Sequence, residues 1–153
     1  YNKLNDPVFA RELSNKIIIK IAELLKATQL PYLTPEAIAM AAMYTANHYD
    51  IKGSIALTET GATPLWMSRI RSGIPIYGLA RSLRTTRRLA LYRGVYPLYF
   101  DIDKAPKGNI SQFAIEELKK HNFLRKGERV LITYGDLLKI TGGTNTLKIL
   151  EVN

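Results

Sequence analysis

Two patterns of apolar residues alternate along the chain. In one, apolar side chains recur three or four residues apart, as on one face of an α-helix; in the other, several follow one another, as in a buried strand. Glycine, proline or hydroxyl residues separate most segments. The pattern predicts a first helix from Asp6-Pro7 to just before Gln29, helices over residues 34–49, 64–71, 82–92 and 109–123, and strands over residues 54–58, 74–80, 95–100, 128–134 and 146–152.

The order of these elements predicts the class of fold. Strands that alternate with helices usually pair in parallel, with helices on both faces of the sheet. Residues 135–145, between the last two strands, are too few and too rich in glycine to form a crossover helix. We therefore predict a three-layer α/β domain over residues 31–153, with a mostly parallel five-stranded sheet and an antiparallel edge strand, and a separate N-terminal helix within residues 1–30.

Composition narrows the class of protein. The 153 residues are 46% hydrophobic and 23% charged, as in an ordinary globular domain. No apolar run is long enough to span a bilayer, so we expect no membrane partner. The chain has no cysteine, which excludes a disulfide scaffold and a thiolate metal site and favours a cytoplasmic location. His48 and His121 are too far apart in the sequence to suggest a zinc site, so we expect no metal in this chain.

Positive charge is concentrated in one region. Between Thr60 and Phe100 there are seven arginines and no acidic residue, in a chain of formal net charge +9. Arg81, Arg84 and Arg88 fall on one stripe of the predicted helix. Four interpretations stay open: a field that attracts an anionic ligand, ion pairs across a subunit or domain interface, contacts with a nucleic-acid backbone, and a solvated face. Nucleic acid is the least favoured partner, because no reading helix or stacking platform accompanies the charge.

A hydroxyl-rich turn joins the strand over residues 54–58 to the next helix. Ligands of open α/β sheets bind beyond the carboxyl ends of the strands, and the first amides of a helix lack partners within it and attract anions. Backbone amides and threonine hydroxyls would bind a phosphate, and a glycine would let the backbone approach it. The alternative is that Thr60 or Thr63 only caps the helix. The candidate phosphate-binding residues are Thr58, Thr60, Gly61, Ala62 and Thr63.

A second loop, between the last two strands, has similar chemistry. Thr141, Gly142, Gly143 and Thr144 suit a backbone that folds over a polar ligand, although a plain hairpin connection requires similar residues. Elsewhere the sequence has no phosphate loop with lysine, no dinucleotide fingerprint, no serine–histidine–acid set and no catalytic pair of carboxylates. The pattern therefore predicts a binding site and no catalytic residue.

Several stretches resemble the C-terminal domain of pyruvate kinase. They are EAIAMAAMYTANHYDIKGSIALTETGATPLWMSRIRSGIPIYGLAR, RRLALYRGVYPLYFD, KGERVLITYGD and GGTNTLKIL, which occur in the family's order. The resemblance covers residues 34–152 and does not extend to residues 1–30. It implies that residues 1–30 lead in from a catalytic barrel that this chain lacks.

The resemblance implies a regulatory and oligomerisation domain. The family's enzyme transfers phosphoryl from phosphoenolpyruvate to ADP in glycolysis, with magnesium and usually potassium bound in the barrel, so this chain would be inactive alone and would hold no cofactor. The C-terminal domain carries an allosteric site for a phosphorylated sugar or a nucleoside monophosphate, and part of the tetramer interface. The turn over residues 58–63 matches the segment that holds the effector's phosphate, and residues 141–144 match the loop that closes over it. The alternative is a purely structural assembly domain with a vestigial effector site.

Departures from the family pattern concern the charge of the ligand. Some members hold the second phosphate of fructose bisphosphate with a tryptophan and an arginine; the shorter segment DIDKAPKGNI has neither, and Lys104 or Lys107 would have to substitute. Glu59 lies inside the turn, where a carboxylate near a phosphate is unfavourable unless it points away. Ala62 replaces a basic residue. We therefore predict a monophosphate effector, or a weakened site, rather than a bisphosphate one.

Overall fold

The computed structural model describes residues 34–135 and 142–153, and residues 34–153 form one compact unit. The predicted helix within residues 1–30, as well as Thr141, lies outside the described residues. The elements are, in chain order, α2 (Thr34–His48), β1 (Gly53–Leu57), α3 (Ala62–Arg69), β2 (Ile76–Ala80), α4 (Leu83–Leu89), β3 (Val95–Tyr99), the short 3-10 helix η2 (Ile102–Lys104), α5 (Ile110–Lys120), β4 (Arg129–Tyr134) and β5 (Thr146–Glu151).

The five strands form one sheet in the order β3-β2-β1-β4-β5. β1 pairs in parallel with both β2 and β4, and β2 pairs in parallel with β3. β5 pairs antiparallel with β4, at the edge. This sheet confirms the predicted fold class. The edge strand is antiparallel because the connection before β5 is too short to return a strand in the parallel direction.

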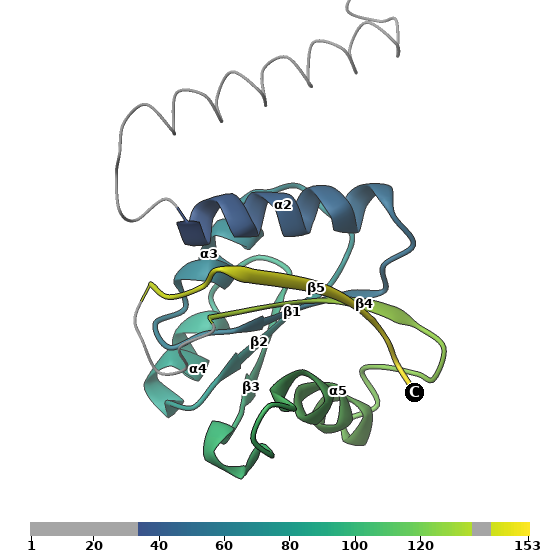
Figure 1. Ribbon diagram of the computed structural model, residues 1–153. Coiled ribbons are helices and arrows are strands. Elements are labelled where there is room, and N and C mark those ends of the chain that lie inside the picture. The colour runs from purple at the N-terminus through teal and green to yellow at the C-terminus, as the bar shows by residue number, and fades with distance from the viewer. Residues whose placement is uncertain (1–33, 136–141) are drawn as a thin grey trace, which may run out of the picture. The chain divides into compact units, whose positions relative to one another are not determined.

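Helices cover both faces of the sheet, as Figure 1 shows for α2 on one side and α5 on the other. The two faces arise from the alternation of side chains along each strand. On β1, Ile55 and Leu57 belong to the buried cluster beneath α5, whereas Ala56 belongs to the cluster beneath α2, α3 and α4. The sheet is therefore buried on both sides, as a parallel sheet requires.

The connections place a crevice between β1 and β4. From β1 the chain moves through α3 to β2 and through α4 to β3, and α5 then returns it to β4 on the other side of β1. The strand order reverses at this point, and the loops that leave the carboxyl ends of β1 and β4 lie at the same edge of the sheet. Such a switch point is where open α/β sheets bind ligands.

The helix predicted over residues 82–92 is shorter than expected. α4 ends at Leu89, and the amides of Leu91 and Tyr92 then bond to carbonyls three residues earlier, which is the tighter geometry of a turn. Arg81 precedes α4 and does not share its helical stripe with Arg88.

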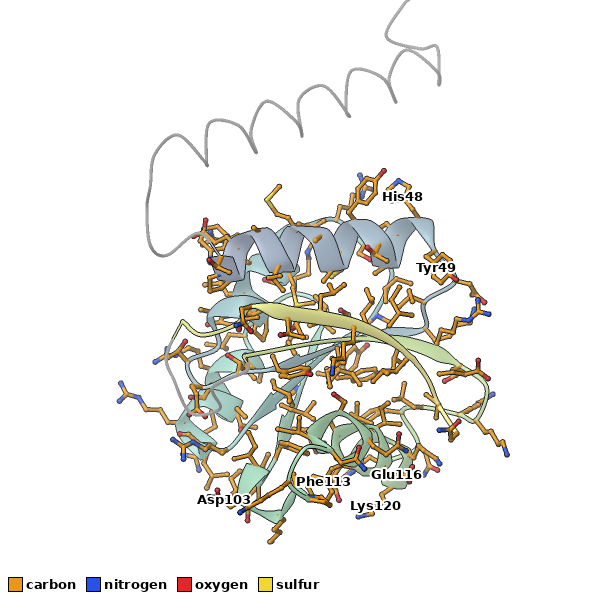
Figure 2. All side chains as sticks on the ribbon, viewed as in Figure 1. His48, Tyr49, Asp103, Phe113, Glu116 and Lys120 are labelled. Atoms are coloured by element: carbon orange, nitrogen blue, oxygen red, sulfur yellow. The ribbon has the colours of Figure 1, made fainter. Side chains whose placement is uncertain are left out.

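The side chains labelled in Figure 2 come from the end of α2, from η2 and from α5. His48 and Tyr49 lie at the end of α2, while Glu116 and Lys120 lie on α5, on the opposite face of the sheet. In the part of the chain that the structure describes, no helix is long and apolar enough to cross a membrane.

Candidate functional site

A cavity of about 50 Å³ lies at the carboxyl ends of β1 and β4. One water needs roughly 10–15 Å³ of such space, so a group of phosphate size fits. The cavity brings together both loops that the sequence indicates, although Gly61 does not line it and Thr141 lies outside the described residues. The lining residues are Pro35, Leu57, Thr58, Glu59, Thr60, Ala62, Thr63, Leu79, Arg81, Phe100, Ile102, Tyr134, Gly135, Gly142, Gly143 and Thr144.

Gly61 begins helix α3 and shapes the turn. It is the N-cap residue and adopts the left-handed conformation, with φ of 85°. A residue with a β-carbon is strained in this conformation, which explains the glycine. The alternative that Thr60 or Thr63 is the cap is therefore wrong, because the capping position has no side chain and no side-chain cap hydrogen bond is present among the described residues.

Two amides at the start of α3 remain available to a ligand. The Gly61 amide donates to Thr58 Oγ1 at 2.9 Å, and the Leu65 amide donates to the Gly61 carbonyl at 3.1 Å. Pro64 has no N–H group. The amides of Ala62 and Thr63 donate to no acceptor within the described residues. These two N–H groups carry the partial positive charge of the helix N-terminus, and both residues line the cavity.

A buried hydrogen bond joins the two loops of the site. The hydroxyl oxygens of Thr63 and Thr144 lie 2.9 Å apart, and either one can donate. A hydroxyl both donates and accepts, so this bond uses one of the two hydroxyl hydrogens and leaves the other to donate to an anion. The pair therefore closes one side of the cavity and keeps a donor at its wall.

Helix α4 holds the turn from the other side. Thr85 Oγ1 donates to the Glu59 carbonyl at 2.9 Å, and Arg88 Nη1 donates to the Thr60 carbonyl at 3.2 Å. Because N–H and C=O point in opposite directions across a trans peptide, the bond from Thr85 directs the Thr60 amide away from α4. None of the four sequence interpretations of the arginines includes this role for Arg88. Arg84, Arg87 and Arg88 are all exposed.

Glu59 forms an ion pair at the rim of the cavity. Arg81 Nε donates to Glu59 Oε2 at 2.8 Å. The hydrogen bond from Arg81 to Glu59, together with the charge of Glu59, raises the pKa of the Arg81 guanidinium above its usual value. The sequence analysis gives the Glu59 carboxylate as unfavourable near a phosphate. In the structure Arg81, which follows the end of the neighbouring strand β2, neutralises its charge.

The loops also meet through two glycines. A β-carbon on Gly135 would collide with the carbonyl oxygen of Gly143, so the backbones approach as closely as glycine allows. The sequence analysis did not identify Gly135 or Arg81 as site residues. Each directly follows the end of a predicted strand, and this position could have marked both as candidate site residues. Only the strand order shows that these strand ends lie next to the end of β1.

The described residues contain no group of three or more histidines, cysteines, aspartates or glutamates that could hold a metal ion.

The fold and the cavity define an α/β domain with a polar-lined cavity at the switch point of its sheet. The family described as "Pyruvate kinase, alpha/beta domain" matches residues 36–150, and the chain belongs to this family. Pyruvate kinase from Buchnera aphidicola subsp. Acyrthosiphon pisum (strain APS) is 48% identical over 118 residues, which are 76% of this chain and 24% of that protein. Pyruvate kinase II from Salmonella typhimurium (strain LT2) is 44% identical over 119 residues, with the same shares. The chain thus spans about a quarter of the length of these relatives.

Proposed function

We propose that this domain is the regulatory and assembly domain of a cytoplasmic pyruvate kinase, and that it binds a phosphorylated effector. The parent enzyme would transfer phosphoryl from phosphoenolpyruvate to ADP in a barrel domain. The observation that carries the proposal is the pair of amides on Ala62 and Thr63, which have no acceptor among the described residues. They lie at a cavity that is lined by both the turn over residues 58–63 and the loop over residues 142–144. Unpaired amides at a helix N-terminus favour an anion, and phosphate is the anion that best matches several converging donors.

The remaining groups of the cavity fit the rest of such an effector. Leu79, Phe100 and Tyr134 supply apolar walls, and the backbone of Gly142 and Gly143 lies opposite the turn. A sugar or nucleoside offers an apolar ring face and hydroxyls, which suit this mixture of side chains. The effector candidates are therefore a phosphorylated sugar and a nucleoside monophosphate.

Binding would regulate the parent only through a difference in affinity. An effector shifts an equilibrium between two arrangements by the ratio of its affinities for them. The Thr63–Thr144 bond connects the loop before β5 to the start of α3, so occupation of the cavity would favour the arrangement in which both loops are in place.

The assembly role rests on a different surface. Met40 and Tyr44 of α2 are exposed to 39% and 46%, and Tyr49, directly after the helix, is exposed to 52%. Exposed apolar side chains that gather on one surface mark interaction sites. This surface supports the second candidate function, a purely structural assembly domain with a vestigial effector site. Sedimentation of the wild-type chain and of Tyr44→Glu tests assembly through α2: we expect the variant to dissociate at concentrations where the wild type is associated.

Calorimetry of the chain with ribose 5-phosphate and with AMP tests effector binding. We expect one site per chain for at least one of these monophosphates, and competition by inorganic phosphate. Saturation with neither ligand at millimolar concentration would contradict the effector role and leave the structural candidate.

A further inference from the structure

The outer face of α4 combines exposed leucines with exposed arginines. Leu83 and Leu91 are exposed to 60% and 84%, although leucine is among the residues most often buried. Arg84 and Arg87 are exposed as well. At about 100° per residue around the helix axis, these four side chains fall on one face of α4 and of the turn that continues it. We call this surface the α4 face.

The opposite side of α4 fixes the α4 face in place. Thr85 and Leu89 are buried, and Leu89 belongs to the apolar cluster beneath α2, α3 and α4. Thr85 Oγ1 and Arg88 Nη1 donate hydrogen bonds to carbonyls of the turn after β1. Helix α4 therefore cannot turn its exposed leucines inward, and the surface is formed before any partner binds.

The two arginines of the α4 face have no partner within the domain. In the part of the chain that the structure describes, neither guanidinium makes a hydrogen bond, an ion pair or a ring contact. No acidic residue lies between Thr60 and Phe100. Burial of an unpaired charge is costly, so a partner that covers this face must bring negative charge.

This chain has little negative charge to offer to such a face. Among the described residues, five acidic side chains already form ion pairs with lysine or arginine, namely those of Asp50, Glu59, Asp101, Glu116 and Glu117. Residues 1–33 include five basic and three acidic residues, and the chain has a formal net charge of +9. A second copy that presented the same face would bring arginine against arginine, which is repulsive. The occupant is therefore a different molecule, with negative charge.

The leucines distinguish among negatively charged partners. Leu83 and Leu91 lie about 12 Å apart along the helix, which corresponds to about two helical turns of a partner. A nucleic-acid backbone would pair with the arginines but would leave the leucines uncovered. A helix that lies in a bilayer surface buries a wide, continuous apolar face, whereas here arginines lie between the leucines. Arginine interspersed with apolar side chains is typical of a surface that binds protein.

We propose that the α4 face is a docking surface for an acidic segment of a separate protein. Carboxylates of this segment pair with Arg84 and Arg87, and its apolar side chains cover Leu83 and Leu91. The small apolar area and the charged surroundings suit a partner that binds reversibly. The proposal does not depend on the effector cavity, which none of these four residues lines.

Fluorescence anisotropy of a labelled peptide tests the proposal with the full 153-residue chain. The probe is a peptide of about 12 residues, built from glutamates with leucines two helical turns apart, and the matched probe has serines in place of the leucines. We expect the leucine probe to bind with a dissociation constant in the micromolar range and to bind more weakly as salt is raised. The serine probe should bind at least about fivefold more weakly, because it buries no apolar surface.

Two variants of the α4 face and one matched control locate the binding. Arg84→Gln combined with Arg87→Gln should weaken binding of the leucine probe by about tenfold or more, since two charge-assisted hydrogen bonds are lost. Leu91→Ser should weaken it by about fivefold. Arg125→Gln combined with Lys126→Gln removes the same charge from exposed side chains between α5 and β4, and should change the affinity by less than about twofold. All the substituted side chains are exposed, so melting temperatures should stay within about 3 °C of wild type.

The outcomes decide the nature of the partner. Selective loss in both α4 variants supports the docking surface. Equal loss in the control variant, or equal affinity for the two probes, overturns it, because charge alone would then explain the binding. Binding of neither probe by the wild type at millimolar concentration also overturns it. If oligothymidylate, or vesicles of phosphatidylcholine and phosphatidylserine, bind through the α4 face more tightly than the leucine probe, the choice of a protein partner is overturned.

Discussion

The hydroxyl oxygens of Thr63 and Thr144 lie 2.9 Å apart, although 81 positions separate these residues in sequence. Both are buried, with exposures of 2% and 8%. The bond joins the first turn of α3 to the loop before β5, so it fixes the position of one wall of the cavity relative to the other.

Removal of both hydroxyls should destabilise the domain by less than the sum of the two single removals. Thr63→Val keeps the shape and leaves the Thr144 hydroxyl buried without its partner, at a cost of about 1–2 kcal/mol. Thr63→Val combined with Thr144→Val should cost less than the sum of the single variants. Urea unfolding of the four chains in a double-mutant cycle measures the coupling, and additive effects would show that the bond contributes little.

Gly61→Ala should destabilise the turn. The φ of 85° is unfavourable for alanine, and its β-carbon would lie 3.2 Å from Leu89 Cδ2. We expect a loss of about 1–2 kcal/mol in the free energy of unfolding. Gly73→Ala is the matched control, since its β-carbon would meet nothing within 4 Å, and it should stay within about 0.5 kcal/mol of wild type. Equal effects in denaturant melts would contradict the assigned role of Gly61.

Gly135→Ala should displace the glycine loop. The new β-carbon would collide with a backbone carbonyl of Gly143, which cannot rotate away as a side chain can. We expect weaker binding of ribose 5-phosphate in calorimetry, by about tenfold if the loop contributes one hydrogen bond to the ligand. Wild-type affinity in this variant would mean that the loop does not contact the ligand.

Arg93→Ala should weaken the far end of α3. The Arg93 guanidinium donates to the carbonyl of Ser68 through Nε and Nη2, at 3.3 and 3.1 Å, and to that of Ile70 at 3.2 Å. A cation at a helix C-terminus also interacts favourably with the helix dipole, so we expect a cost of about 1–2 kcal/mol. Arg93→Lys keeps the charge without the forked donors and should recover part of the loss in thermal unfolding. No recovery would indicate that geometry alone matters.

The sequence predicted the arrangement of helices and strands because alternation and spacing of apolar residues are local signals. The same kind of local signal made three of the candidate site residues identifiable, namely Thr58, Gly61 and Gly143. Each belongs to a short segment whose residue types suit a turn beside a strand end. The bond between Thr63 and Thr144 was not predictable, since it depends on β5 returning beside β4 and on β4 adjoining β1.

The roles of Arg81 and Arg88 required the three-dimensional arrangement. In the sequence they form part of an arginine-rich stretch with several possible partners. In the structure Arg81 bonds to Glu59 and Arg88 to the Thr60 carbonyl, because β2 lies next to β1. Strand order, which no local pattern specifies, decides which loops share an edge of the sheet.

The measurement that tests the central claim most directly is a titration of the ¹⁵N-labelled chain with inorganic phosphate, followed through its backbone amide signals. The account predicts saturable shifts concentrated on the amides of Thr60, Ala62 and Thr63, with smaller shifts at Gly142 and Gly143. Shifts confined to the exposed arginines of α4, or none at the start of α3, would contradict an anion site at this turn.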